Sequence, residues 1–534
     1  MQLKHVTRLG FSAFFLAWCF DQLFWQKAPG ISFFIFILLC LGAGIALTWG
    51  EKLRPAVNSL LLVIPILFFA GMTFLRQEPF TLLVDYGLAL GCMLLLSLTW
   101  LGGRWWRYSL SDYVANALRW VGDVLVKPFP VFWSGRMPHR QGDELGTGTA
   151  KRSVLVRTLL SVLLGLLLAL PVVFLLARLL AEADPVFSQQ LNQLLRLIDI
   201  EKLDEYLFRL FYISIGAHLL SGVFLYALSA SQGEKVSGGE KSWLSPFLGW
   251  VEAATLLACV DLLFAFFVGI QFRYFFGGQA NINVEGFTYS DYARRGFGEL
   301  VAVAFISLLL LFALSAITRR EERHPRRIFS GLGITLVALV AVILISAFQR
   351  LQLYEIAYGF SRLRTYTHVF MIWLGLLLLA TALLEALNRL RYFALAALIA
   401  SIGFGVTVNL VNVDGFIARQ NISRAAQGAR LDRGYLISLS EDAVPVLFEQ
   451  FDSPRLSSDL QDQVGAVLAC WAAMQPDATE RQPWPSFHWA RQRARALYQS
   501  HQAELERYPV RRVDYEWRVT INGVEKSCWE QQGH

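Results

Sequence analysis

Arginine and tyrosine residues gather in the short segments that join the apolar stretches in the second half of the chain. Guanidinium groups bind phosphate and carboxylate through paired hydrogen bonds, and tyrosine hydroxyls add further donors. Four of these residues, from position 350 to 362, are spaced by four, so a helix through them would carry all four on one face. We therefore expect a site for an anion such as a lipid headgroup or an envelope precursor. The candidate residues are Arg273, Tyr289, Tyr292, Arg294, Arg295, Glu299, Arg350, Tyr354, Tyr358, Arg362, Arg364, Asn409, Asn412 and Asp414.

A structural interpretation of the same arginines stays open. Acidic residues lie in the same segments and could pair with them, and arginine side chains also reach toward lipid headgroups without forming a dedicated site. The acidic residues concerned are Asp184, Glu285, Asp291, Glu299, Glu355 and Asp414.

Carboxylates in or beside the apolar stretches suggest two further functions. Asp21, Asp85 or Glu299 could act as a general base in a transferase that uses a lipid-linked substrate. A polar path through Asp261 and His218 would fit a transporter.

No sequence motif supports an enzyme activity. The chain contains no Walker A loop, HExxH, GxSxG or paired CxxC motif, and its eight histidines show no metal-ligand spacing. We expect no cofactor and no metal, we assign no catalytic residue, and the balance is against an enzyme.

The elements that position these residues must be membrane-spanning helices. Of the 534 residues, 55% are hydrophobic and 17% are charged, whereas soluble domains average about 45–50% and about 25%. A helix needs about 20 apolar residues to cross a bilayer. Eleven stretches qualify, at about 8–26, 30–49, 55–75, 80–101, 154–180, 206–229, 246–272, 295–317, 328–349, 366–388 and 392–413.

Basic residues predict the orientation of these spans. With a cytoplasmic N-terminus, 22 Lys and Arg residues before the last span fall on the cytoplasmic side and 12 on the other side. An odd number of spans then places the C-terminal region in the periplasm. Six of the 12 outer residues are the arginines of the candidate site, so the site should lie on the outer face.

Four regions follow from this topology. Residues 1–101 form a four-span region, 102–153 a cytoplasmic loop, 154–414 a seven-span core and 415–534 a periplasmic soluble domain. The soluble domain should be mainly helical, near 440–451, 457–474 and 486–506, and end in a candidate β-hairpin around Asn522 and Gly523. The fold class is an all-α polytopic transmembrane bundle of about eleven spans with this small domain attached.

The cytoplasmic loop contains an amphipathic pattern. Its apolar residues recur at helical spacing among aromatic and basic residues, which favours a helix lying in the membrane interface. Packing of that helix against the spans is the alternative. The apolar positions are Leu110, Val114, Leu118, Val121 and Leu125.

Two of the six cysteines lie in the soluble region. Cys470 and Cys528 are the only pair available there, so a periplasmic location predicts a disulfide between them.

Several motifs resemble the bacterial polytopic family catalogued as domain of unknown function 4173, with 4153 as its neighbour. The resemblance covers about 155–445 and implies a bacterial inner-membrane protein without implying an activity. The motifs are ADPVF (183–187), VEAAT (251–255), FRYFFGG (272–278), YSDYARRGFGELVAVA (289–304), RLQLYEIAYGFSRLR (350–364), NLVNVDGFIARQN (409–421) and LDRGYLISLSEDAVP (431–445).

We therefore expect an inner-membrane protein that binds or senses an envelope component. Its partners would be the lipid bilayer, anionic lipid headgroups and a periplasmic protein that contacts the C-terminal domain. Nucleic acid is not expected, since basic and aromatic residues do not alternate in any soluble segment large enough to bind it.

Overall fold

The chain folds into two compact units. The structure, a computed structural model, describes residues 6–133, 203–231, 247–276, 297–319, 323–474 and 482–529, with isolated positions between 173 and 190. The first unit combines residues 1–62, 94–103 and 115–234, and the second combines 63–93, 104–114 and 235–534. Each is described separately.

The first unit is built around helix α1 (Val6–Phe24), which packs against α2 (Ile31–Gly50) and α10 (Leu203–Ser229). The short α3 (Val57–Leu60) meets the end of α5 (Pro79–Thr99), where the Ser59 hydroxyl donates to the Thr99 carbonyl at 2.5 Å. Helix α6 (Leu110–Val126) crosses α10 so closely that a Cβ atom on Gly222 would lie 2.2 Å from the Val124 carbonyl oxygen. After α6 comes α7 (Pro128–Trp133).

The apolar face predicted for the cytoplasmic loop is present on α6. Leu110, Val114, Leu118, Val121 and Leu125 are all exposed along one side of this helix. Whether that side lies in the membrane interface stays a prediction.

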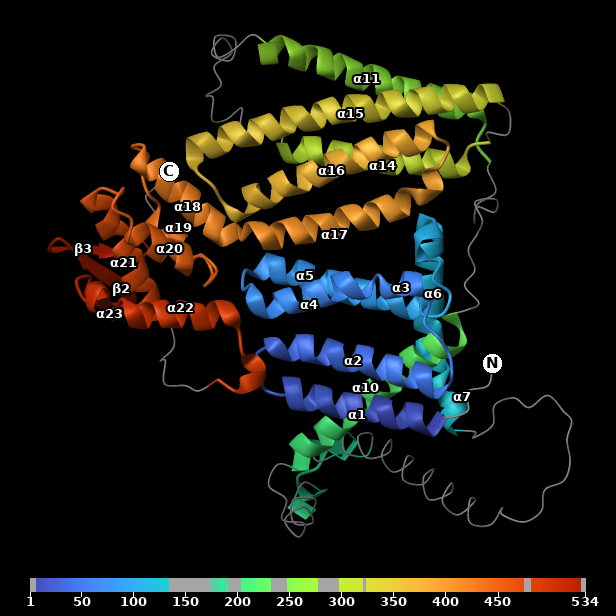
Figure 1. The fold of residues 1–534 in the computed structure, drawn as a ribbon, viewed down its shortest axis with the longest axis horizontal. Helices are drawn as coiled ribbons and strands as arrows, with labels where there is room; N and C mark the ends of the chain where they lie inside the picture. The colour runs from blue at the N-terminus through green and yellow to red at the C-terminus, as the bar shows by residue number, and fades with distance from the viewer. Residues whose placement is uncertain are drawn as a thin grey trace, which may run out of the picture. The chain divides into compact units, whose positions relative to one another are not determined.

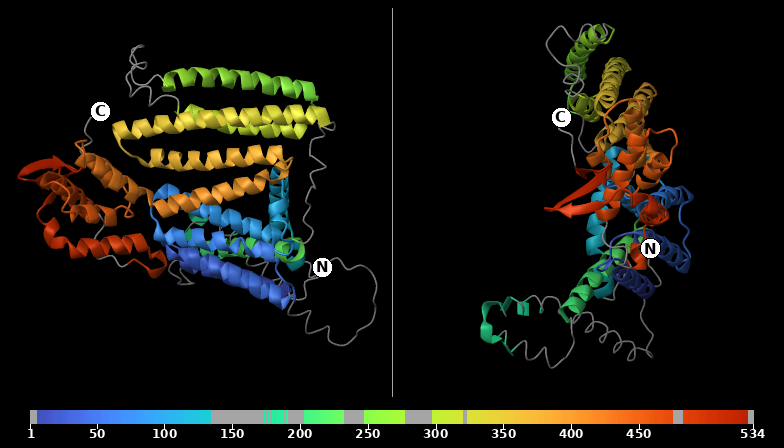
Figure 2. Two further views of the ribbon diagram at one scale, coloured as in Figure 1. Left: turned by 45° about the horizontal axis from the view of Figure 1, so that its top comes forward. Right: turned by 90° about the vertical axis from the view of Figure 1, so that its left-hand side faces the viewer.

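The second unit contains a row of long helices (Figures 1 and 2). Helix α15 packs against three others in this row, and one apolar core, including the buried Leu257, Leu311, Ile343 and Leu378, runs through them. Helix α17 packs against α4 and α16. The elements are α4 (Val63–Leu75), η1 (Trp105–Arg107), α11 (Trp250–Phe276), α14 (Phe297–Ile317), α15 (Arg323–Tyr358), α16 (Arg362–Ala386), η4 (Leu390–Tyr392) and α17 (Phe393–Val411).

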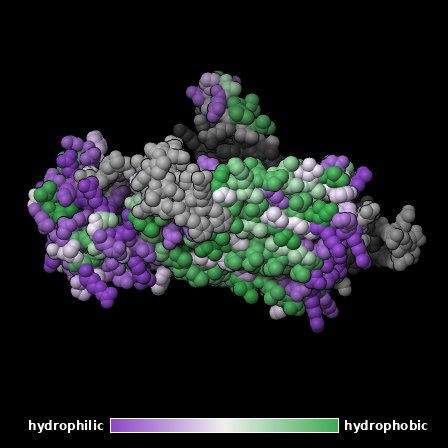
Figure 3. All heavy atoms as spheres, turned by 90° about the horizontal axis from the view of Figure 1, so that it is seen from above, coloured by the Kyte–Doolittle hydropathy of each residue, from purple (hydrophilic) through white to green (hydrophobic). Residues whose placement is uncertain are grey.

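Nine helical segments in the described ranges are long and apolar enough to cross a membrane, so the protein is a multi-pass membrane protein. Figure 3 shows the apolar surface on one face, with hydrophilic residues at both ends. Each segment coincides with a predicted span. They are Ile31–Gly50, Val57–Leu75, Pro79–Thr99, Glu205–Ser229, Trp250–Gln271, Gly298–Ser315, Arg323–Tyr358, Arg362–Ala386 and Leu390–Val411.

Two of the eleven predicted spans are not in this set. The stretch 8–26 does form a helix, α1, which is 19 residues long, but it contains the charged residues Arg8 and Asp21 and is not apolar enough to be counted with the nine segments. Most of the stretch 154–180 lies outside the described residues.

The C-terminal part of the second unit is helical and ends in a small sheet. Three antiparallel strands are paired in the order β1-β2-β3, and Asn522 and Gly523, both with positive φ, form the β2–β3 turn. Cys470 and Cys528 form a disulfide, with 6.0 Å between their Cα atoms. The elements are α18 (Val413–Ala426), α19 (Arg433–Ile437), α20 (Val444–Phe451), α21 (Ser458–Met474), η5 (Trp484–Ser486), α22 (Trp489–Ser500), α23 (Gln502–Leu505), β1 (Val510–Val513), β2 (Glu516–Ile521) and β3 (Val524–Ser527).

Candidate functional site

The corner between α15 and α16 separates the four residues that the sequence places on one helical face. Helix α15 continues to Tyr358 and carries Arg350, Tyr354 and Tyr358. Gly359 then adopts φ +86°, a conformation that ends the helix, and α16 begins at Arg362. The prediction of one common face is therefore wrong for Arg362, which points into a different cluster.

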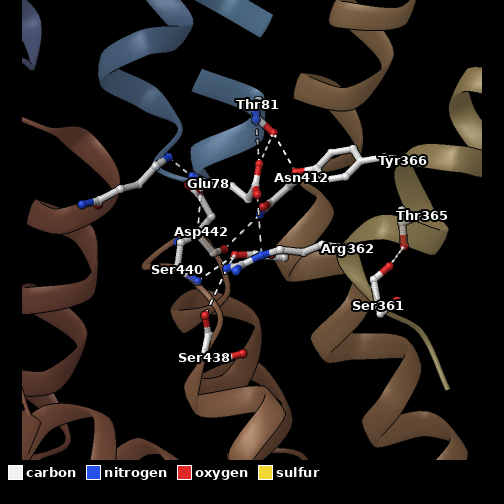
Figure 4. A network of polar contacts seen from close by, with 12 residues as sticks. Glu78, Thr81, Ser361, Arg362, Thr365, Tyr366, Asn412, Ser438, Ser440 and Asp442 are labelled. Carbon is white, nitrogen blue, oxygen red and sulfur yellow. Dashed lines mark hydrogen bonds and ion pairs between the residues drawn. The ribbon is translucent and has the colours of Figure 1, made fainter. Parts of the chain in front are cut away.

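Arg362 is bound by an acidic side chain. Its Nε and Nη2 atoms donate to the two carboxylate oxygens of Asp414 at 2.7 and 2.6 Å, and Nη2 also donates to the Ser438 carbonyl at 3.2 Å (Figure 4). Asp414 is fully buried and also accepts the Ser440 backbone N–H at 2.7 Å. For these two residues the structural interpretation of the sequence is the one that the geometry supports.

Asp442 joins the C-terminal part to the turn between α4 and α5. One of its carboxylate oxygens accepts the backbone N–H groups of Gln77 at 2.6 Å and Glu78 at 3.0 Å. Glu78 precedes Pro79, the first residue of α5, and accepts the backbone N–H and the hydroxyl of Thr81 at 2.6 and 2.9 Å. It thus caps the helix by accepting one of the N–H groups that the first turn leaves without a helical partner.

Asn409 connects the end of α17 to the same turn, and Asn412 connects it to Asp442. The Asn409 carbonyl accepts Nε and Nη2 of Arg76 at 3.0 and 2.7 Å, and its side-chain amide donates to Asp85 at 2.6 Å. Asn412 has φ +51°, the left-handed conformation that asparagine tolerates, and redirects the chain from α17 into α18. Its amide donates to the Asp442 carbonyl at 3.1 Å.

These contacts define a group of side chains that we call the junction cluster: Arg76, Glu78, Asp85, Arg362, Asn409, Asn412, Asp414, Asp442 and His488. The ends of α4 and α17 and the starts of α5, α16 and α18 all contribute to it. Buried and part-buried hydrogen bonds therefore connect one end of the second unit's helices to the C-terminal part.

Two arginines, Arg364 and Arg424, flank Gly359. Arg364 donates to the Gly359 carbonyl and lies over the Tyr354 ring, 4.1 Å from its centroid. Arg424 donates to the carbonyls of Ile356 and Ala357 at 2.9 and 3.2 Å. Burial and the neighbouring positive charge of Arg364 lower the pKa of Arg424. Within the described ranges, neither guanidinium forms an ion pair.

Other predicted residues lie apart from this pair or outside the described residues. Arg350 donates to the Gln271 side chain at 2.8 Å, and Glu299 is exposed in the first turn of α14. The ring of Tyr358 lies 5.0 Å from that of Tyr354. Arg273 belongs to α11, and Tyr289, Tyr292, Arg294 and Arg295 lie outside the described residues.

Asp21, one of the carboxylates suggested as a catalytic base, is tightly held in the first unit. It is buried, and it accepts Nε of Arg209 at 2.9 Å as well as the Arg209 Nη2 and the Tyr212 hydroxyl. Glu205 accepts the Trp25 indole N–H nearby at 2.8 Å. Asp21 thus has the contacts of a structural ion pair rather than those of an accessible base.

Two groups of the junction cluster should respond to pH in opposite directions. Burial raises the pKa of Asp442 to about 6, against the opposing effects of the Gln77 and Glu78 N–H groups and Arg76. Burial lowers the pKa of His488 to about 4, although its ring bonds the Arg76 carbonyl at 2.9 Å. As the pH falls, Asp442 takes up its proton at a higher pH in the folded state than in the unfolded state, so its protonation stabilises the fold. His488 takes up its proton at a higher pH in the unfolded state than in the folded state, so its protonation destabilises the fold.

We expect these two contributions to offset each other in the wild type between about pH 4 and 6.5. Asp442→Asn leaves the histidine contribution, so its unfolding free energy should fall relative to wild type by on the order of 3 kcal/mol on acidification across that range. Over the same range, the unfolding free energy of His488→Gln should rise relative to wild type by a similar amount. Urea unfolding in detergent micelles at several pH values measures both. Parallel pH profiles for the wild type and both variants would contradict the offset.

Several of these residues were not among the sequence-based candidates. Four of them, Arg76, Glu78, His488 and Arg424, lie in none of the quoted motifs, although Glu78-Pro79 is a helix-start signal. Asp442 lies in the LDRGYLISLSEDAVP motif but was not chosen as a site residue. Their partners are up to 412 residues away in the sequence, as for His488 and Arg76.

Comparison with known proteins identifies the family. The model of the family described as Domain of unknown function (DUF4153) matches residues 63–450, from α4 to α20. This is the neighbour named in the resemblance; family 4173 is not among the matches. No curated protein and no solved structure matches the chain. Because the matched segment covers most of the sequence and all but His488 of the junction cluster, the chain belongs to the DUF4153 family.

Proposed function

We propose that the protein is an inner-membrane protein that binds an anionic phosphate group at its outer face, between Arg364 and Arg424. The phosphate belongs to a lipid headgroup or to a lipid-linked envelope precursor, and the C-terminal domain is periplasmic. The observation that carries the proposal is the pair of guanidinium groups around Gly359, which have no acidic partner in the described part of the chain.

The pair retains unused hydrogen-bond donors. A guanidinium has five N–H donors, and Arg424 uses its Nη2 atom for two carbonyls, while Arg364 uses one Nη1 contact. Both side chains are partly accessible to solvent. Two adjacent positive charges repel each other, so an anion between them would relieve the repulsion and accept the remaining N–H groups.

The position of the pair along the helices agrees with a headgroup ligand. Helix α15 has 36 residues and is therefore about 54 Å long, whereas the hydrocarbon core is about 30 Å thick. Its apolar stretch ends near residue 349, so the turns that contain Tyr354 and Tyr358 extend beyond the hydrocarbon. At this level the pair faces phosphate groups, and tyrosine rings are favoured at the same depth.

The positive-inside count supports the orientation proposed here. It favours a cytoplasmic N-terminus, and the α15–α16 corner then lies on the periplasmic side. The junction cluster ties the C-terminal part to the same end of the helices, which agrees with a periplasmic domain.

Arg364→Ala combined with Arg424→Ala is expected to reduce retention of anionic lipid at least tenfold. Hydrogen bonds to charged groups contribute about 1.5–3 kcal/mol each, and a loss of about 1.4 kcal/mol already corresponds to tenfold weaker binding. Native mass spectrometry of protein released from phosphatidylglycerol-containing micelles measures the bound lipid. Inorganic phosphate added as a competitor shows whether a free phosphate suffices or the lipid is needed.

The matched control is Arg419→Ala on the same helix, α18. Arg419 pairs with Glu449 at 2.8 Å, and this variant should retain lipid as the wild type does. Equal retention by the double variant and the control, with both folded by thermal unfolding, would refute the site and leave the two arginines as caps of the α15 carbonyls.

A further inference from the structure

Three aromatic side chains are exposed around a histidine that is itself buried. Trp484 is 65% exposed, Phe487 37% and Trp489 52%, whereas His488 between them is buried. In contrast, Trp471 of the same domain is buried in the apolar core. Isolated exposed apolar residues are common, but three large aromatics within six residues mark a surface that meets an apolar partner.

The buried histidine fixes the position of this segment. His488 bonds the carbonyl of Arg76 at 2.9 Å, and Arg76 is the first residue after the spanning segment Val57–Leu75. Helix α22, which starts at Trp489, also packs against α4. Phe487 and Trp489 are adjacent to His488, and Trp484 is four residues away, which is at most about 15 Å.

The end of a membrane span lies at the boundary between hydrocarbon and headgroups. Tryptophan is enriched at that boundary because its ring is apolar while its N–H can reach water or a headgroup. We propose that residues 484–489 form an aromatic edge by which the C-terminal domain inserts into the interfacial layer of the bilayer, beside the end of α4. The partner is the lipid surface itself and does not depend on the anion site of the previous section.

Charged groups near the edge fit this location. Arg491 donates to the Gln482 side chain at 2.6 Å and lies 3.8 Å from Glu441, so polar groups border the aromatic residues toward the C-terminal domain. An apolar edge with a polar border on its domain side is the pattern of a monotopic membrane contact.

Photo-cross-linking of the full-length protein tests the edge. A benzophenone amino acid replaces Trp484, Trp489 or, as a matched control, Tyr515, an exposed aromatic residue in the β1–β2 turn. Each variant is reconstituted in phosphatidylcholine vesicles, which lack anionic lipid, and irradiated. We expect lipid adducts in the mass spectra of the 484 and 489 variants, at least fivefold above those of the 515 variant.

Equal adduct yields at all three positions, or no lipid adduct at 484 and 489, would overturn the proposal. Cross-links from 484 or 489 to other segments of this chain in place of lipid would also overturn it, since the residues would then lie in a protein contact. The vesicles contain no anionic lipid, so the adduct yields do not depend on whether Arg364 and Arg424 bind a phosphate.

Discussion

Arg362→Ala should lower the free energy of unfolding by about 3–5 kcal/mol, the range measured when one partner of a buried ion pair is removed. The substitution leaves Asp414 fully buried with the Ser440 N–H as its remaining partner. It also removes the donor to the Ser438 carbonyl and a positive charge 3.6 Å from Glu78. Denaturant unfolding in detergent micelles, followed by circular dichroism, measures the change.

Two comparisons separate this effect from a general effect of losing an arginine. Arg419→Ala removes a pair whose side chains are 55% and 59% exposed, so a change of at most about 1 kcal/mol is expected. Replacement of both charges, Arg362→Met with Asp414→Leu, should recover part of the stability because Asp414 no longer leaves a buried charge without its partner, while the buried Glu78 still loses its neighbouring cation. A loss below about 1 kcal/mol for Arg362→Ala would mean that Asp414 is not a buried anion.

Removal of the disulfide is expected to have an effect of similar size. Cys470 and Cys528 are separated by 58 residues, and a cross-link over such a loop reduces the entropy of the unfolded chain by an amount equivalent to about 4 kcal/mol. Cys470→Ser with Cys528→Ser, or a reducing agent on the wild type, should destabilise the C-terminal part accordingly. The rate at which a protease cleaves that part at increasing denaturant concentration measures the difference in stability.

Cys259→Ser is the control for this experiment, because Cys259 is a free and exposed cysteine on α11. It should leave stability nearly unchanged with and without reductant. Alkylation and mass spectrometry of protein taken directly from its native membrane provide a second measurement. Two alkylated thiols at positions 470 and 528 would contradict both the disulfide and the oxidising location proposed for the domain.

The spanning helices were predictable from the sequence because their determinant is local. A run of about 20 apolar residues is stable in a bilayer as a helix regardless of its neighbours, and nine of the predicted spans coincide with helices in the described residues. The C-terminal helices and the Asn522-Gly523 turn have local signals as well, namely helical periodicity and a dipeptide suited to positive φ.

The junction cluster was only partly predictable because its determinants are distant in sequence. Arg362 and Asp414 were both recognised as candidates, yet nothing local indicated that they bind each other across 52 residues. The prediction that Arg350, Tyr354, Tyr358 and Arg362 share one helical face failed for a local reason instead, because Gly359 ends α15 before Arg362. Exposed fractions and partners, which decide whether an arginine is free, come only with the tertiary fold.

The contact between Asp442 and the α4–α5 turn has a consequence for biosynthesis. Gln77 and its acceptor are 365 residues apart, and ribosomes add about 5–20 residues per second, so roughly 20 to 70 s separate their synthesis. During that interval the N–H groups of the turn must be hydrated, because their final acceptor does not yet exist. The helical hairpin α4–α5 therefore has to be inserted with its connecting turn in water, and the assembly of this end of the protein is completed only after translation of the C-terminal part.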